Sequence, residues 1–205
     1  MGITTQTGII PPTTNSRAPN NPLSVYMKEF DMYKGEYYHF WCAPESNGIL
    51  PSLYQQVLSL AEDEVWVWDA YFHQVDAVIF GALSKPGVAI KMITEPKVPI
   101  QDFINGLVTN METALASSNK VGCKITIVQS KGQGYSDWKM HDRFLIVDQR
   151  RVYLIGSSVG NYLNMGESTG AYEITEEEDK ELIINAYDFY WTKLDVIGNV
   201  ASHSF

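Results

Sequence analysis

The feature that most constrains the fold is a regular alternation of strand-like and helix-like segments in the middle of the chain. Short apolar runs, typical of strands buried on both faces, are separated by longer segments with apolar residues at helical spacing. The predicted strands are 65–69, 88–93 and 123–128, and the predicted helices are 75–83 and 100–116. Strands that alternate with helices indicate an α/β sandwich, with a mixed central sheet flanked by helices.

Further elements are predicted on both sides of this alternation. They are a strand at 35–43 and a helix at 50–61 before it, and strands at 141–147 and 152–155 and a closing helix at 176–194 after it. The turn at 149–151 is short enough to pair the two late strands. With 205 residues the chain has room for one sizeable domain, which we place at 25–205.

Residues 1–24 are rich in threonine, asparagine and proline and show no periodicity. This composition predicts an extended or disordered arm. Packing of this arm on a neighbouring subunit is an alternative interpretation.

Chemistry-bearing residues surround the strand at 141–147. His141 and Arg143 lie two residues apart, so a strand would point both side chains to the same face. Asp148 follows the apolar run, and the next strand ends at Gly156-Ser157-Ser158. A potential nucleophile, a fixed positive charge and a small-residue turn that offers hydroxyls and N–H groups together suggest phosphate chemistry.

This pattern resembles the signature of the phospholipase D superfamily, in which H-x-K-x4-D is followed by a Gly-Ser turn and an asparagine. The matching residues are His141, Arg143, Asp148, Gly156, Ser157 and Asn161. Arginine stands where the family has lysine, and Asn161 lies further from the glycine than is usual. The signature occurs once, whereas many members carry two copies in one chain.

The resemblance implies a metal-independent phosphodiesterase without a cofactor, in which His141 attacks phosphorus and forms a phosphohistidine. In the family a second histidine protonates the leaving oxygen. Because this chain carries one motif, that histidine would come from an identical chain across a two-fold axis, so a homodimer is expected. The implied substrate is a nucleic acid or a phospholipid head group.

The resemblance also suggests roles for the neighbouring residues. Arg143 would bind the phosphoryl oxygens, Asp148 would hold the turn after the strand, and Glu173 would orient the nucleophilic histidine. Ser157, Ser158 and Asn161 would bind the substrate or orient side chains. Arginine and lysine are not interchangeable. If Arg143 fits, the site is an active variant; if it fills the pocket or pairs with a carboxylate, the site binds without turnover.

Asp69, Tyr71 and His73 follow the first strand of the alternation. Ligands gather beyond the carboxyl ends of strands in α/β sheets, so these side chains are candidates to line the same cleft. The alternative is a helix N-cap with aromatic packing.

The composition is that of an ordinary globular protein, with 45% hydrophobic and 19% charged residues. No apolar run is long enough to span a membrane, and the N-terminus lacks the pattern of a signal peptide. Cys42 and Cys123 have no metal-ligand spacing and are interpreted as buried thiols. A cytoplasmic protein is therefore expected.

The formal net charge of −9, from 15 basic and 24 acidic residues, argues against a general nucleic-acid binder. Basic residues nevertheless gather between Lys131 and Arg151, so a local basic site remains open. Two alternatives to the enzyme follow. One is a non-catalytic phospholipase D-like module for binding or assembly, and the other is a nucleic-acid-binding regulator that uses the fold without cleavage.

Overall fold

A computed structural model describes residues 35–40, 52–116, 123–129, 142–156, 158–159, 169–196 and 200–205. The strands are β1 (Gly35–Phe40), β2 (Glu64–Trp68), β3 (Ala89–Thr94), β4 (Lys124–Gln129), β5 (Phe144–Val147), β6 (Arg151–Ile155), β7 (Thr169–Ile174) and β8 (Val200–Ser204). The helices are α2 (Ser52–Leu58), the 3₁₀ helix η2 (Gln74–Ala82), α3 (Ile100–Ala116) and α5 (Glu177–Val196). The predicted arm at 1–24 and Cys42 lie outside the described residues.

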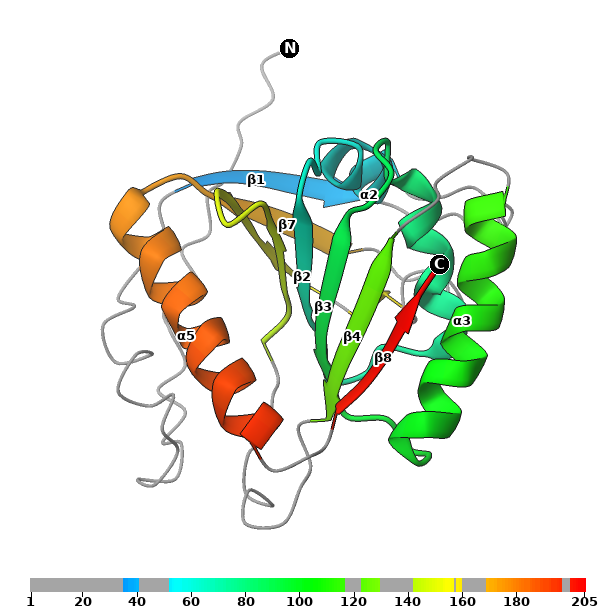
Figure 1. Cartoon of the computed structure of the whole chain (residues 1–205). Coiled ribbons are helices and arrows are strands. Elements are labelled where there is room, and N and C mark those ends of the chain that lie inside the picture. Colours follow the sequence, from blue (N-terminus) through cyan, green and yellow to red (C-terminus); the bar gives the residue numbers. More distant parts are fainter. Residues whose placement is uncertain are drawn as a thin grey trace.

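The strands form one sheet in the order β1-β7-β6-β5-β2-β3-β4-β8 (Figure 1). β2, β3 and β4 run parallel, and the other pairings in the sheet are antiparallel. The parallel part comes from the alternation of strands and helices in the sequence, because a parallel connection needs a crossover. The predicted α/β sandwich with a mixed sheet is confirmed.

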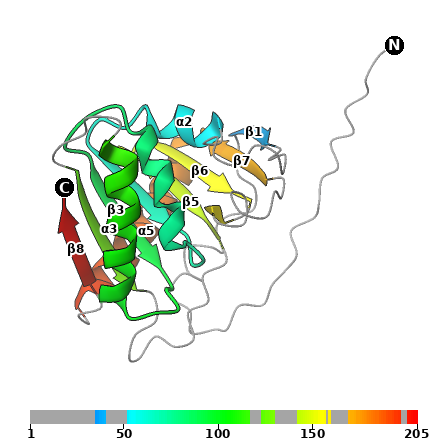
Figure 2. The ribbon, with the colours of Figure 1, turned by 90° about the vertical axis from the view of Figure 1, so that its right-hand side faces the viewer.

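Helices cover both faces of the sheet (Figures 1 and 2). Val65 and Val67 of β2 join one buried cluster with residues of α2, η2 and α3. Trp66 and Trp68 point to the other face and pack with Tyr187 of α5, whose ring stacks on Trp66 at 4.7 Å between centroids. Alternate residues of one strand thus bury on opposite faces. Loss of one of these aromatic rings should cost about 3–5 kcal/mol.

Two antiparallel pairings determine where the candidate motif lies. In the predicted hairpin, Phe144 of β5 is in register with Leu154 of β6, and Val147 with Arg151. β5 also pairs with β2, with Phe144 opposite Trp68. The residues just before β5 therefore lie beside the residues just after β2. This end of the sheet is the carboxyl end of β2 and β3, where ligands gather in α/β folds.

The structure adds two strands that the sequence analysis did not predict. β7 pairs with β1 and β6, and β8 pairs with β4 at an edge of the sheet. Neither has the continuous apolar run of a central strand: β8 has the sequence VASHS, and β7 contains Gly170 and Glu173. Both strands form through backbone pairing with strands that are distant in the sequence, so no local pattern predicts them.

Candidate functional site

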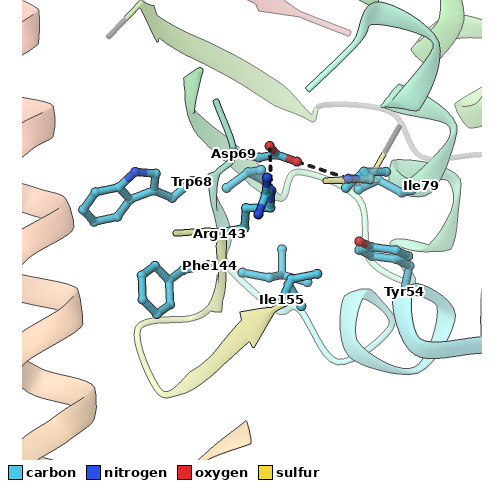
Figure 3. Close-up of a pocket in the computed structure, with 10 residues that line it drawn as sticks. Tyr54, Trp68, Asp69, Ile79, Arg143, Phe144 and Ile155 are labelled. Atoms are coloured by element: carbon cyan, nitrogen blue, oxygen red, sulfur yellow. Dashed lines mark hydrogen bonds and ion pairs between the residues drawn. The ribbon is translucent and has the colours of Figure 1, made fainter. Parts of the chain in front are cut away.

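Arg143 lies immediately before β5 and beside Asp69, the residue that follows β2. Its carbonyl oxygen accepts a hydrogen bond from the N–H of Ile155 at 2.8 Å, which continues the β5–β6 ladder by one residue. The ladder therefore holds the Arg143 backbone in an extended form. Figure 3 shows the Arg143 side chain pointing toward the Asp69 carboxylate, above Ile155.

A buried carboxylate joins the two halves of the motif. Ser158, which follows β6, donates its hydroxyl to Asp69 Oδ1 at 2.9 Å, and the N–H of Val159 donates to Oδ2 at 3.1 Å. Arg143 Nε donates to the Ser158 Oγ at 2.7 Å and lies 3.8 Å from Asp69 Oδ1. The N–H of Tyr71 donates to the same carboxylate at 2.9 Å. The segments after β2 and β6 and before β5 thus meet at one side chain.

The burial of these groups makes the arrangement costly to break. The Asp69 side chain is 4% exposed and that of Arg143 is 20% exposed, while Ser158 is fully buried. A buried charge is tolerated only when it is paired and hydrogen-bonded. Arg143 supplies the opposite charge, and the N–H and O–H groups satisfy the oxygens of Asp69. The cluster is therefore a preorganised unit that fixes the position of the guanidinium.

The guanidinium also contacts an exposed aromatic ring. Arg143 Cζ lies 5.8 Å from the ring centroid of Tyr71, within the range of a cation–π interaction. Below the cluster is a cavity of about 10 Å³, lined in part by Tyr54, Ile79 and Ile155 (Figure 3). This volume is close to the minimum for one water molecule, so the core side of the cluster is tightly packed.

Asp148 lies at the far end of β5 and caps another turn. Its carboxylate accepts hydrogen bonds from the backbone N–H groups of Glu62, Asp63 and Glu64 at 3.0, 2.9 and 2.9 Å. Burial alone would raise its pKa, but these three donors lower the pKa below its ordinary value. Asp148 has a positive φ of 50°, a conformation that aspartate tolerates better than most residues. These contacts are those of a residue that holds a turn against the start of β2.

Glu173 lies away from this cluster. In β7 it is in register with Tyr153, and its carboxylate lies 4.0 Å from the Arg151 guanidinium. Burial raises the pKa of Tyr153, and the negative charge of Glu173 adds to that rise, while Arg151 opposes it. Arg143 is instead beside Ile155, two residues further along β6. Among the described residues, the Glu173 side chain interacts with Arg151 and Tyr153.

His141, Ser157 and Asn161 lie outside the described residues, so their predicted roles remain predictions. The structure brings Arg143 and Ser158 together and places Asp69 and Tyr71 beside them. For Asp69 and Tyr71 the sequence had left two interpretations open, a position in the cleft and a helix N-cap with aromatic packing. His73 lies immediately before η2, and its N–H donates to Asp76 Oδ2 at 2.6 Å. The sequence feature that made Asp69 a candidate site residue was its position directly after a buried strand.

The described part of the chain holds neither a metal site nor a membrane-spanning helix. No group of three or more His, Cys, Asp and Glu side chains has the arrangement of a metal site there. No helix in that part is long and apolar enough to cross a membrane.

The fold of this chain resembles several solved structures. No protein-family model matches it, and no curated protein sequence matches it. Nuc, a phospholipase D family member from Salmonella typhimurium, has a TM-score of 0.50 and 10% identity over 85% of this chain and 100% of its own. NucT from Helicobacter pylori has a TM-score of 0.46 and 15% identity over 84% of this chain and 100% of its own.

Phosphatidylserine synthase of Haemophilus influenzae Rd KW20 also resembles this chain. Its TM-score is 0.44 and its identity 10%, over 82% of this chain and 39% of its own. The likeness to Nuc, which covers 85% of this chain and all of Nuc, establishes the class of the fold: this chain has the phospholipase D fold.

Proposed function

We propose that this chain is a metal-independent phosphodiesterase of the phospholipase D type that works as a homodimer. One observation carries the proposal: Arg143 of the predicted signature and Ser158 of the small-residue turn after β6 are held together on the buried Asp69 at the carboxyl end of β2. A fixed guanidinium at this end of a phospholipase D fold suits the binding of a phosphoryl group. His141 lies two residues before Arg143 in the sequence.

In the proposed reaction, a ring nitrogen of His141 forms a bond to phosphorus while the bond from phosphorus to one ester oxygen breaks. The partner subunit's His141 gives a proton to the departing oxygen, and the first alcohol leaves. Water then attacks phosphorus, the nitrogen–phosphorus bond breaks, and the partner's histidine takes the proton of the water. One difficult displacement becomes two easier ones. Arg143 would stabilise the charge on the phosphoryl oxygens in both steps.

The contacts of the described residues support narrower proposed roles for the other predicted residues. Ser158 holds Arg143 on Asp69 and is proposed as a positioning residue, with Ser157 and Asn161 left as substrate-binding candidates. Asp148 is proposed as structural, on the evidence of its backbone contacts. Glu173 stays a prediction as the residue that orients His141, and its contact with Arg151 offers no support for that role.

The test is the hydrolysis of bis(p-nitrophenyl) phosphate in EDTA by the wild type, by His141→Ala and by the control variant His203→Ala. His203 lies in β8, at an edge of the sheet, where its ring contacts Phe205. We expect His141→Ala to lose on the order of 10³-fold or more of the rate, and His203→Ala to keep it. Intact-mass spectrometry at alkaline pH should detect a p-nitrophenylphosphoryl adduct on the wild type. Hydrolysis that survives in His141→Ala, or that EDTA abolishes, would refute the mechanism.

One observation favours a second candidate, a phospholipase D-like module that binds without turnover. Arg143 lies 3.8 Å from a carboxylate, and this pairing offsets part of the positive charge that a phosphate would meet. A folded dimer that binds dimethyl phosphate through Arg143, but neither hydrolyses the ester nor forms an adduct, would favour the module. Sedimentation at the assay concentration tests the dimer, and a monomer that hydrolyses the ester would exclude the shared site.

A further inference from the structure

A second hollow adjoins the Arg143 cluster and takes no part in the chemistry described above. It lies beyond the carboxyl ends of β2 and β3 and has a volume of about 130 Å³. Its wall consists of two segments, Ala70–Gln74 after β2 and Glu95–Val98 after β3, together with Phe103 of α3. Tyr71 belongs to this wall and is also the ring beneath the Arg143 guanidinium. The hollow and the candidate phosphate site therefore share one side chain.

The wall of the hollow is built from residues held in place. The Gln74 side-chain amide donates to the carbonyl oxygens of Asp102 and Phe103 at 2.9 and 3.3 Å, which ties the start of η2 to α3. This contact needs a glycine at 106, because a Cβ there would overlap the Gln74 amide. The N–H of Glu95 donates to the carbonyl of Ala70 at 3.2 Å and links the two segments of the wall. A ligand would thus enter a largely preformed site.

The size of the hollow limits what it can hold. Pockets for whole drug-sized ligands measure roughly 300–1,000 Å³. A volume of about 130 Å³ is small against that range and suits a single ring or a small head group. The rest of such a ligand would extend toward Arg143, whose guanidinium contacts the Tyr71 ring.

The chemistry of the lining favours a flat, uncharged or anionic ring over a cationic head group. Tyr71 is 44% exposed, so part of its ring is open to stacking, and the buried residues Phe72 and Phe103 line the same hollow. An aromatic wall alone would also suit a quaternary ammonium. Lys97 is exposed on the same wall and the Arg143 guanidinium contacts the Tyr71 ring, so two positive charges oppose a cation there, against the single carboxylate of Glu95 among the lining residues.

We propose that this hollow is a subsite for a nucleobase carried by a phosphodiester whose phosphate lies at Arg143. The inference rests on the proposed function for the position of the phosphate and narrows its substrate to a nucleotide unit. Tyr71 supplies the stacking surface, and Lys97 favours the negatively charged backbone of such a ligand. Stacking of a base on an aromatic side chain tolerates any base, so the subsite selects for a base without selecting its sequence.

The test measures binding and not hydrolysis, so it stays informative if the proposed function fails. The full chain with His141→Ala, which is expected not to consume the ligand, is titrated by NMR with the thymidine dinucleotide d(TpT) and with dimethyl phosphate. Tyr71→Ala should weaken d(TpT) binding by roughly 5- to 150-fold and leave dimethyl phosphate binding within about twofold. Tyr71→Phe keeps the ring and should match the parent. Lys97→Gln should weaken d(TpT) binding by a few-fold.

Two control variants lie at the opposite end of the parallel strands. Leu60 precedes β2 and has the same exposed fraction as Tyr71, 44%, so it is the control for Tyr71. Lys85 precedes β3, whereas Lys97 follows β3, so Lys85 is the control for Lys97. Leu60→Ala and Lys85→Gln should bind both ligands as the parent does. Unchanged d(TpT) binding in Tyr71→Ala would overturn the subsite. An equal loss of dimethyl phosphate binding in Tyr71→Ala would also overturn it, because the ring would then act only through Arg143. A parent protein that binds phosphatidylcholine vesicles more tightly than d(TpT) would overturn it as well.

Discussion

Replacement of Asp148 tests whether this residue of the predicted signature supports the fold and not the chemistry. Its carboxylate accepts three backbone N–H groups from the start of β2, at 2.9–3.0 Å. Hydrogen bonds to a charged group contribute about 1.5–3 kcal/mol each, but these N–H groups lie near solvent, so about 1 kcal/mol each is a fairer figure. Alanine would also disfavour the backbone φ of 50° by about 1 kcal/mol. Asp148→Ala should therefore lose about 4 kcal/mol of unfolding free energy.

Asparagine separates the two contributions, because it tolerates a positive φ and keeps one acceptor oxygen. Asp148→Asn should lose about half as much stability as Asp148→Ala. Because about 1 kcal/mol shifts the melting temperature of a domain of this size by roughly 2–4 °C, thermal unfolding resolves the two variants. Asp63→Ala removes a neighbouring exposed carboxylate and should stay within about 0.5 kcal/mol of the wild type.

The pH dependence gives an independent check on the same contacts. The pKa of Asp148 is lowered in the folded state, so its contribution is complete above the unfolded value of 3.8 and is lost as the pH falls through the folded value. The stability difference between the wild type and Asp148→Asn should shrink on acidification below about pH 4. A variant Asp148→Ala that is as stable as the wild type but inactive would refute the structural role.

Three other substitutions test the cluster and its surroundings. Asp69→Asn places an amide N–H₂ against the Val159 N–H or the Ser158 hydroxyl, so it should lower the unfolding free energy measured with denaturant by about 2–4 kcal/mol. An unchanged unfolding free energy would mean that the carboxylate does not organise the site. Arg143→Lys should weaken dimethyl phosphate binding in a titration, since lysine has no Nε to donate to Ser158, and tighter binding would contradict this. Burial raises the pKa of Asp76 to about 6, and the hydrogen bond from the backbone N–H of His73 opposes this rise. Relative to Asp76→Asn, wild-type stability should fall as the pH rises from about 4 to 6, because the folded state holds a proton that the unfolded state releases; a constant difference would exclude the shift.

Much of the sheet follows from local patterns in the sequence. The runs around Trp66 and Ile146 are apolar over consecutive residues, as expected for strands buried on both faces, and the runs around Ile90 and Ile125 are mostly apolar; each forms a strand inside the sheet. The hairpin between β5 and β6 follows from the short polar turn between two such runs. β7 and β8 escaped prediction because pairing with distant strands forms them, without an apolar run of their own.

The candidate site was predictable only in part, for the same reason. The apolar run predicted the strand and Asp148 just after it, but β5 begins at Phe144, so Arg143 lies immediately before the strand and not within it as predicted. The partner of Arg143 is Asp69, more than seventy residues earlier in the chain, and no local pattern links the two. Glu173 shows the opposite case: its acidic side chain fits the expected role by type, but the register of β7 places it beside Arg151.

The arginine at 143 is best understood together with Asp69. A lysine offers one nitrogen, which would have to serve both the buried carboxylate and a phosphate. A guanidinium has three nitrogens in a rigid plane, and here Nε donates to Ser158 and faces Asp69. Contact at one edge does not by itself prevent phosphate recognition at another, so pairing with a carboxylate need not convert the site into a non-catalytic one. The departure from the family signature and the buried aspartate therefore form one unit, and a double-mutant cycle with Arg143→Lys and Asp69→Asn should give strongly non-additive losses of phosphate affinity.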